Sequence, residues 1–106
     1  MKNSNMKLIN FTGKIIFMGI DVHKKSYSVS CTSEGVLVKK ATLKASPEEL
    51  VIFLKKHFQG AIINSAYEAG FSGFHLHRIL IKNGINNIVV HAASIEISAR
   101  DRVKNR

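Results

Sequence analysis

Two acidic residues each stand at the end of a short apolar segment. Asp21 follows "IIFMGI", and Glu68 ends "AIINSAYE". A carboxylate directly after a buried strand is costly unless a proton, a cation or a partner balances it. Mg²⁺ prefers carboxylate oxygens, and pairs of such ions ~4 Å apart activate water or a hydroxyl in phosphoryl transfer. If the two segments are neighbouring strands, Asp21 and Glu68 are candidate ligands and catalytic residues for Mg²⁺ or Mn²⁺. In the structural alternative, Asp21 caps a turn and Glu68 pairs with a lysine.

The histidines give a weaker metal signal. His75 and His77 are two residues apart in a helical pattern, which places them on different faces, so both are predicted to lie at the surface. His23, close to Asp21, is predicted to be an exposed strand-end residue, with contact to a phosphate or a metal-bound water as the alternative. His57 falls at a predicted helix end, where a positive charge is favoured.

The charge balance indicates a polyanionic partner. Sixteen Lys and Arg residues against seven Asp and Glu give a net charge of +9 and a pI near 10.0, which favours nucleic acid over a merely solvated basic surface. Such contacts would be independent of sequence and sensitive to salt. The candidate nucleic-acid contacts are Lys24, Lys25, Arg100, Arg102, Lys104 and Arg106.

Length and composition predict one domain with a real core. The chain has 106 residues, of which 45% are hydrophobic, and residues 1–13 are predicted to be a flexible N-terminal arm. The single cysteine, Cys31, excludes an internal disulfide, fits a reducing cytoplasm and is predicted to be a buried core residue. No stretch approaches the ~18 apolar residues of a membrane span, so we expect a cytoplasmic protein with no membrane partner.

Hydrophobic patterning predicts the element order β-β-β-α-β-α-β-α. Residues 14–21 lack polar alternation and are predicted to form a central strand covered on both faces. Glu34 and Gly35 mark a turn between two further strands within 25–43, and Ser46 caps a helix that ends before Gly60. The later elements are expected at 61–68 (strand), about 72–83 (helix capped by Ser72), 85–92 (strand) and from Ser94 (helix).

This order predicts an α/β fold with a mixed sheet, in which three antiparallel strands precede alternating helices and parallel strands. Strands joined through helices run parallel by right-handed crossovers, and ligands gather beyond their carboxyl ends. Asp21 and Glu68 both stand at that end of a predicted strand. We therefore expect them to lie at one edge of the sheet.

Three stretches carry a resemblance to a known family. "GIDVHKKSYSV", "YEAGFSGFHLHRILIKNG" and "IVVHAASIEISARDRVKNR" resemble the N-terminal domain of DEDD-type insertion-sequence transposases of the IS-one-ten group, over residues 14–106. The resemblance implies a ribonuclease H-like, RuvC-like catalytic domain. It also implies that Asp21 and Glu68 are the first and second catalytic acids of metal-dependent DNA cleavage and transfer.

The family pattern continues past this chain. In the family two further aspartates follow shortly after the "DRVK" stretch, whereas this sequence stops at Arg106, and Asp101 belongs to the "DRVK" stretch itself. We therefore expect an incomplete site and little strand cleavage by this chain alone. The resemblance also implies a guide RNA and a serine nucleophile in a later domain, and transposition, which needs paired active sites, implies a homo-oligomer.

The sequence leaves two other hypotheses about function open. One is a non-catalytic nucleic-acid-binding module that kept the fold and the basic surface. The other is an actin-like nucleotide-binding domain, which needs phosphate loops. Gly70 and Gly73 in "EAGFSG" do not have the spacing of a P-loop, and no Gly-Lys-Ser/Thr follows them.

Overall fold

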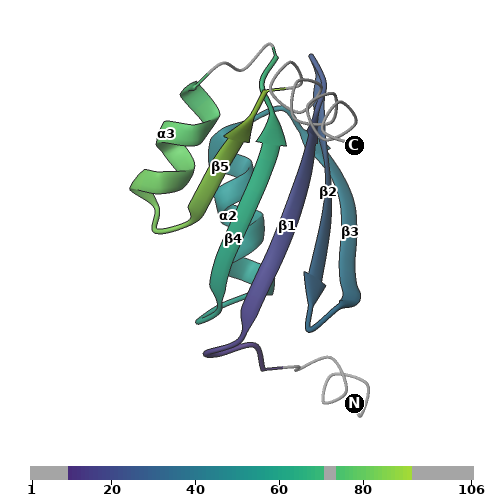
Figure 1. Ribbon diagram of the computed structural model, residues 1–106, viewed down its shortest axis with the longest axis vertical. Coiled ribbons are helices and arrows are strands. Elements are labelled where there is room, and N and C mark those ends of the chain that lie inside the picture. Colours follow the sequence, from purple (N-terminus) through teal and green to yellow (C-terminus); the bar gives the residue numbers. More distant parts are fainter. Residues whose placement is uncertain (1–9, 71–73, 92–106) are drawn as a thin grey trace, which may run out of the picture.

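In the part of the chain that the structure describes, five strands form one mixed sheet in the order β3-β2-β1-β4-β5 (Figure 1). The computed structural model describes residues 10–70 and 74–91. Along the chain the elements are β1 (Ile15–Val22), β2 (Ser26–Ser33), β3 (Val36–Lys44), α2 (Pro47–His57), β4 (Ile62–Glu68), α3 (His75–Lys82) and β5 (Asn86–Val90).

The strand directions agree with the predicted topology. β2 is antiparallel to both β1 and β3, whereas β4 is parallel to both β1 and β5. The β2–β3 turn is the one predicted, because Glu34 (φ 53°) and Gly35 (φ 80°) both adopt the positive φ that a tight hairpin of this kind requires. The α/β class and the mixed sheet are confirmed, and the predicted helix from Ser94 lies outside the described residues.

The two described helices begin in different ways. The Oγ of Ser46 accepts a hydrogen bond from the backbone N–H of Glu49 at 3.2 Å, and Pro47 occupies the first turn of α2, as predicted. Helix α3 begins at His75 after Phe74, which makes no side-chain capping bond. The predicted cap, Ser72, lies outside the described residues.

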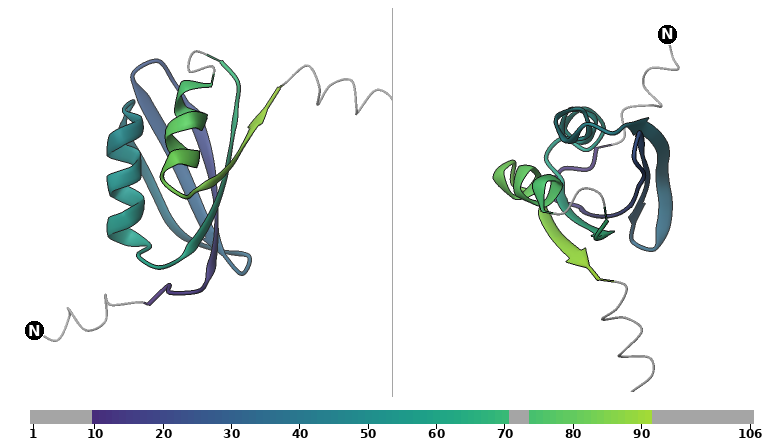
Figure 2. Two further views of the ribbon diagram at one scale, coloured as in Figure 1. Left: turned by 90° about the vertical axis from the view of Figure 1, so that its left-hand side faces the viewer. Right: turned by 90° about the horizontal axis from the view of Figure 1, so that it is seen from above.

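Both helices pack on the same face of the sheet (Figure 2). The core between them and the sheet includes the fully buried side chains of Ile16, Val29, Cys31, Leu50, Leu54, Leu76 and Leu80. Burial confirms the prediction for Cys31 and raises the pKa of its thiol to about 11 through desolvation, opposed in part by Lys39. Among the described residues no helix is long and apolar enough to cross a membrane.

The opposite face of the sheet, called the open face below, carries no described helix. The prediction that the 14–21 strand is covered on both faces is therefore wrong for the described part of the chain. β1 alternates strictly between exposed and buried residues, and Ile15 and Phe17 are 47% and 56% exposed. Apolar side chains occupy both the exposed and the buried positions of β1. The sequence therefore shows no alternation, and Ile15 and Phe17 resemble core residues.

Residues before β1 contact the core. The ring of Phe11 packs edge-to-face on Phe58 with centroids 5.1 Å apart, and Gly13 N–H donates to the carbonyl of Gly60 at 2.9 Å. These contacts tie the start of β1 to the end of α2. The rest of the predicted arm, residues 1–9, lies outside the described residues.

Candidate functional site

The structure brings Asp21 and Glu68 to neighbouring positions on adjacent strands. β1 and β4 are parallel, and Ile20 is paired with Tyr67, so the next position on each strand holds an acid. Neighbouring strands lie about 4.8 Å apart, and both acids are exposed. Two carboxylates this close repel each other unless a proton or a cation lies between them.

Both acids line one depression of about 620 Å³ at the carboxyl edge of the parallel strands. β2 contributes Ser28 and Ser30 to its wall, and β3 contributes Lys40. Gly19 also lines the depression, and a Cβ added at this position would meet no heavy atom within 4 Å. The depression is therefore shallow and open, and two acidic residues and one lysine lie along it.

His23 holds one side of the site. Its Nε2 lies 3.0 Å from the Oδ2 of Asp21, and both side chains are more than half exposed. The backbone N–H of His23 donates to the carbonyl of Ser26 at 2.9 Å, which closes the β1–β2 turn and places the ring beside the strand end. The prediction of an exposed strand-end residue is confirmed, and the contact with Asp21 adds a partner that the sequence did not identify.

The donor chemistry fits a divalent cation in part. Carboxylate oxygens are the donors that Mg²⁺ and Mn²⁺ prefer, and Mg²⁺ commonly uses only one or two carboxylates with several waters. Among residues 10–70 and 74–91, no group of three or more His, Cys, Asp or Glu side chains is arranged to hold a metal. The depression thus offers two carboxylate donors, Asp21 and Glu68, and room for water.

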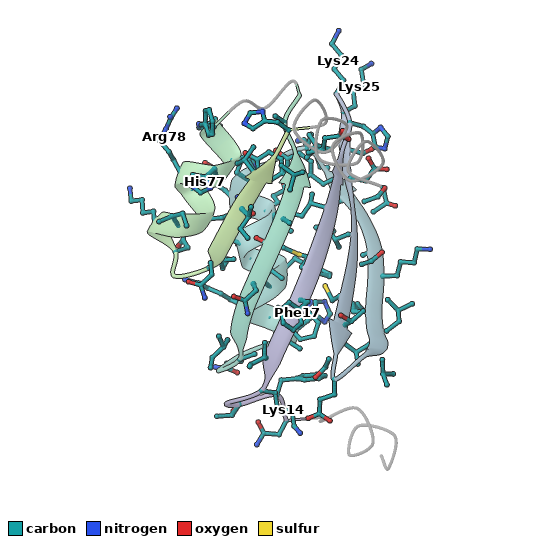
Figure 3. All side chains as sticks on the ribbon, in the orientation of Figure 1. Lys14, Phe17, Lys24, Lys25, His77 and Arg78 are labelled. Atoms are coloured by element: carbon teal, nitrogen blue, oxygen red, sulfur yellow. The ribbon has the colours of Figure 1, made fainter. Side chains whose placement is uncertain are left out.

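The predicted nucleic-acid contacts are only partly described. Lys24 and Lys25 are exposed in the β1–β2 turn next to His23, and Figure 3 shows both side chains extending beyond the end of the strands. They flank the carboxyl edge at which Asp21 lies. The other four, Arg100, Arg102, Lys104 and Arg106, lie outside the described residues.

Two of the remaining histidines differ from their predictions. His77 is partly buried on α3, where its Nδ1 lies 2.9 Å from the Nδ2 of Asn87, so it belongs to a packed network rather than to the free surface. His57 stands in the last turn of α2, as predicted, but desolvation and the nearby charges of Lys39 and Lys56 lower its pKa. A positive charge on His57 is therefore disfavoured, first because the ring is partly desolvated and then because the two lysines repel it.

Comparison with known proteins gives one informative sequence match. No protein-family profile matches the chain. A transposase for insertion sequence element IS1533 from Leptospira borgpetersenii is 27% identical over 92 residues, which cover 84% of this chain and 27% of that protein. The chain is similar to an insertion-sequence transposase. It spans about a quarter of the length of this relative.

Comparison with solved structures reports on the fold. A protein of unknown function with an actin-like ATPase fold, from Bacteroides thetaiotaomicron, superposes with a TM-score of 0.56 at 15% identity, over 82% of this chain and 37% of that one. The ethanolamine utilization protein EutJ from Carboxydothermus hydrogenoformans gives a TM-score of 0.49 at 12% identity, over 81% and 40%. The first match places the sheet and helices in a known α/β arrangement, whereas the RuvC-like subtype rests on the sequence resemblance alone.

Proposed function

We propose that this chain is an N-terminal, RuvC-like part of a DEDD-type insertion-sequence transposase, which acts on DNA with Mg²⁺ or Mn²⁺. The observation that carries the proposal is the pair Asp21 and Glu68 at neighbouring positions of two parallel strands, in one depression. The similarity to a transposase supports it from the sequence. The strand order β3-β2-β1-β4-β5 supports a ribonuclease H-like class, to which actin-like folds are related.

In this proposal the two carboxylates hold the cation, and the residues around them orient them. When bound, Mg²⁺ would polarise a phosphoryl oxygen and acidify a coordinated water. His23 restricts the Asp21 carboxylate through its 3.0 Å contact, as hydrogen bonds to a ligating carboxylate commonly do. We propose Lys24 and Lys25, which are exposed in the adjacent turn, as contacts to the DNA backbone.

Strand cleavage and transfer belong, in this proposal, to the complete transposase. The chain covers 27% of its transposase relative, and its described residues supply two acidic ligands. We expect two carboxylates to bind Mg²⁺ weakly and to support little cleavage. A guide RNA and a homo-oligomer are further proposals for the complete protein, and both follow from the family resemblance.

The similarity to an actin-like fold raises a second candidate, a nucleotide-binding domain. Such a site needs a turn, usually rich in glycine, whose N–H groups surround the phosphates. The β1–β2 turn at this edge consists of His23, Lys24 and Lys25 and contains no glycine. We therefore favour a DNA-processing domain.

Calorimetric titration with Mg²⁺ and Mn²⁺ tests the proposal. The wild-type chain is expected to bind one of these ions at millimolar concentration, and Asp21→Asn is expected to abolish the heat. Glu48→Gln, which removes an equal charge from the first turn of α2, serves as the control and should bind like the wild type. Equal binding by the Asp21→Asn variant would contradict the proposed site.

A further inference from the structure

Lys40 lines the acidic depression from β3, the strand at one edge of the sheet. It lies on β3 opposite Ser30 of β2, and Ser30 in turn lies opposite Gly19 of β1. All three line the depression that contains Asp21 and Glu68. The edge strand thus contributes a cation to a site whose acids come from the centre of the sheet.

Lys40 makes no described ion pair with Asp21 or Glu68. Among the described residues the ion pairs are Lys14 with Glu34 and His23 with Asp21, and Lys40 takes part in neither. From the strand spacing and the rise along a strand, the Cα atoms of Lys40 and Asp21 are about 12 Å apart. That separation exceeds direct contact and leaves room for a further group between the ammonium and the carboxylates.

Small residues form the surface between Lys40 and the two acids. Gly19 has no side chain there, and its Cβ position is open space. Ser28 and Ser30 offer hydroxyl groups along the same wall, and the Oγ of Ser28 lies 3.4 Å from the Oγ1 of Thr42. Nothing bulky among the described residues separates the cation from the acid pair.

We propose that Lys40 binds a DNA backbone phosphate inside this depression, with Ser28 and Ser30 as hydrogen-bond donors, next to the acid pair. The assignment rests on the proposed function for the identity of the anion. A phosphate carries the negative charge and the acceptor oxygens that an ammonium group and two hydroxyls would bind. Lys40 also offsets the repulsion between the phosphate and the carboxylates, so it acts as a DNA-binding residue.

DNA binding to charge variants tests this role. A fluorescein-labelled DNA duplex is titrated with the chain at several salt concentrations, and fluorescence anisotropy gives the affinity. Lys40→Ala is expected to weaken binding by roughly three- to tenfold. It should also make the negative slope of log K against log salt shallower by about 0.9, the value for one lost phosphate contact. Lys40→Arg should retain the slope.

A control variant separates this contact from the general charge effect. Lys56→Ala removes an equal charge from α2, which covers the other face of the sheet, and should leave the slope unchanged. A Lys40→Ala variant that keeps the wild-type slope, or a Lys56→Ala variant that loses as much, would overturn the proposal.

The Lys40 effect is also measured in an Asp21→Asn/Glu68→Gln background. This background removes the proposed metal ligands while leaving the phosphate contact in place. The slope should still fall when Lys40 is replaced there, even if the wild-type chain binds no metal. An unchanged slope in that background overturns the phosphate contact, whereas failure of the metal site is read separately from calorimetry.

Discussion

At the residue scale, Asp21 and Glu68 place two acidic side chains at the ends of adjacent strands. Two carboxylates at adjacent positions of parallel strands repel each other, and both are exposed at the end of the sheet. Only one of them has a described partner, since His23 contacts Asp21. Residues that reduce the stability of a fold without an evident structural role are typical of functional sites.

We predict that Glu68→Gln stabilises the metal-free chain. Removing one charge relieves the repulsion with Asp21, and the expected gain in the free energy of unfolding is about 0.2–1 kcal/mol. Urea denaturation in the presence of EDTA measures it. Glu34→Gln is the matched comparison, because Glu34 is paired with Lys14; it should be neutral or destabilising. A Glu68→Gln variant less stable than the wild type would contradict the repulsion.

Cys31 gives the fold a pH dependence in alkaline solution. Desolvation raises its pKa from 9.0 to about 11, so the folded chain keeps a proton that the unfolded chain has already lost. The resulting stability is fully present below pH 9.0 and is lost as the pH rises toward about 11. We predict that Cys31→Ala, although less stable at neutral pH, shows a shallower decline over this window. An equally steep fall of the free energy of unfolding with pH in both proteins would contradict the role of Cys31.

At the scale of elements, a buried polar network joins β4, β5 and α3. The Oγ of Ser65 donates to the Oδ1 of Asn87 at 2.6 Å, and the Nδ2 of Asn87 lies 2.9 Å from the Nδ1 of His77. The backbone N–H of His77 also donates to the hydroxyl of Tyr67 at 3.1 Å. Ser65 and Asn87 are 5% and 8% exposed. Asn87 thus joins β5 to both β4 and α3, and this network supports the register of β5.

We predict that Asn87→Ala destabilises the chain by about 1–3 kcal/mol, because it leaves the Ser65 hydroxyl buried without its acceptor. A double-mutant cycle with Ser65→Ala isolates the coupling, and the second substitution should cost little once Asn87 is gone. Asn86→Ala is the control: Asn86 is exposed and bonds Asn64 at 3.2 Å, so its loss should cost under about 0.5 kcal/mol. Additive costs of the two buried substitutions would contradict the network.

The elements were predictable where local chemistry dictates them. Ser46, Pro47 and Glu49 specify the start of α2, and Glu34 with Gly35 specifies the hairpin turn. The open face was not predictable, since Ile15 and Phe17 are apolar yet exposed. Nor was the role of Asn87, because its partners lie on separate elements and become neighbours only in the folded sheet.

The candidate site was predictable in outline. Acids at the ends of two apolar strands pointed to one edge of a sheet, and parallel pairing of β1 with β4 brings Asp21 and Glu68 there. Lys40 was missed, because its place in the depression depends on the register of β3 across β2 and on the shift between Cys31 and Thr32. Such a register is a property of the whole sheet, which a segment of sequence does not reveal.

At the scale of the whole molecule, the charge balance supports the proposed polyanionic partner. The chain carries a net charge of +9, while its two exposed strand-end acids lie in one depression beside Lys40 and next to the turn that carries Lys24 and Lys25. In the proposed site, the acidic pair would hold a divalent cation and Lys40 would hold a phosphate next to it. The similarity to a transposase gives this arrangement a consistent biological setting.

The central claim is that Asp21 and Glu68 share one divalent cation, and Mn²⁺ titration of the ¹⁵N-labelled chain followed by NMR tests it most directly. Paramagnetic broadening should appear first at the amides of Asp21 and Glu68 and at their neighbours on β1 and β4. It should disappear in the Asp21→Asn/Glu68→Gln variant, while the signals at the C-terminal end of α2, at the opposite end of the sheet, stay sharp in both proteins. Sharp signals at Asp21 and Glu68 up to high millimolar Mn²⁺, or broadening that persists in the variant, would contradict the shared site.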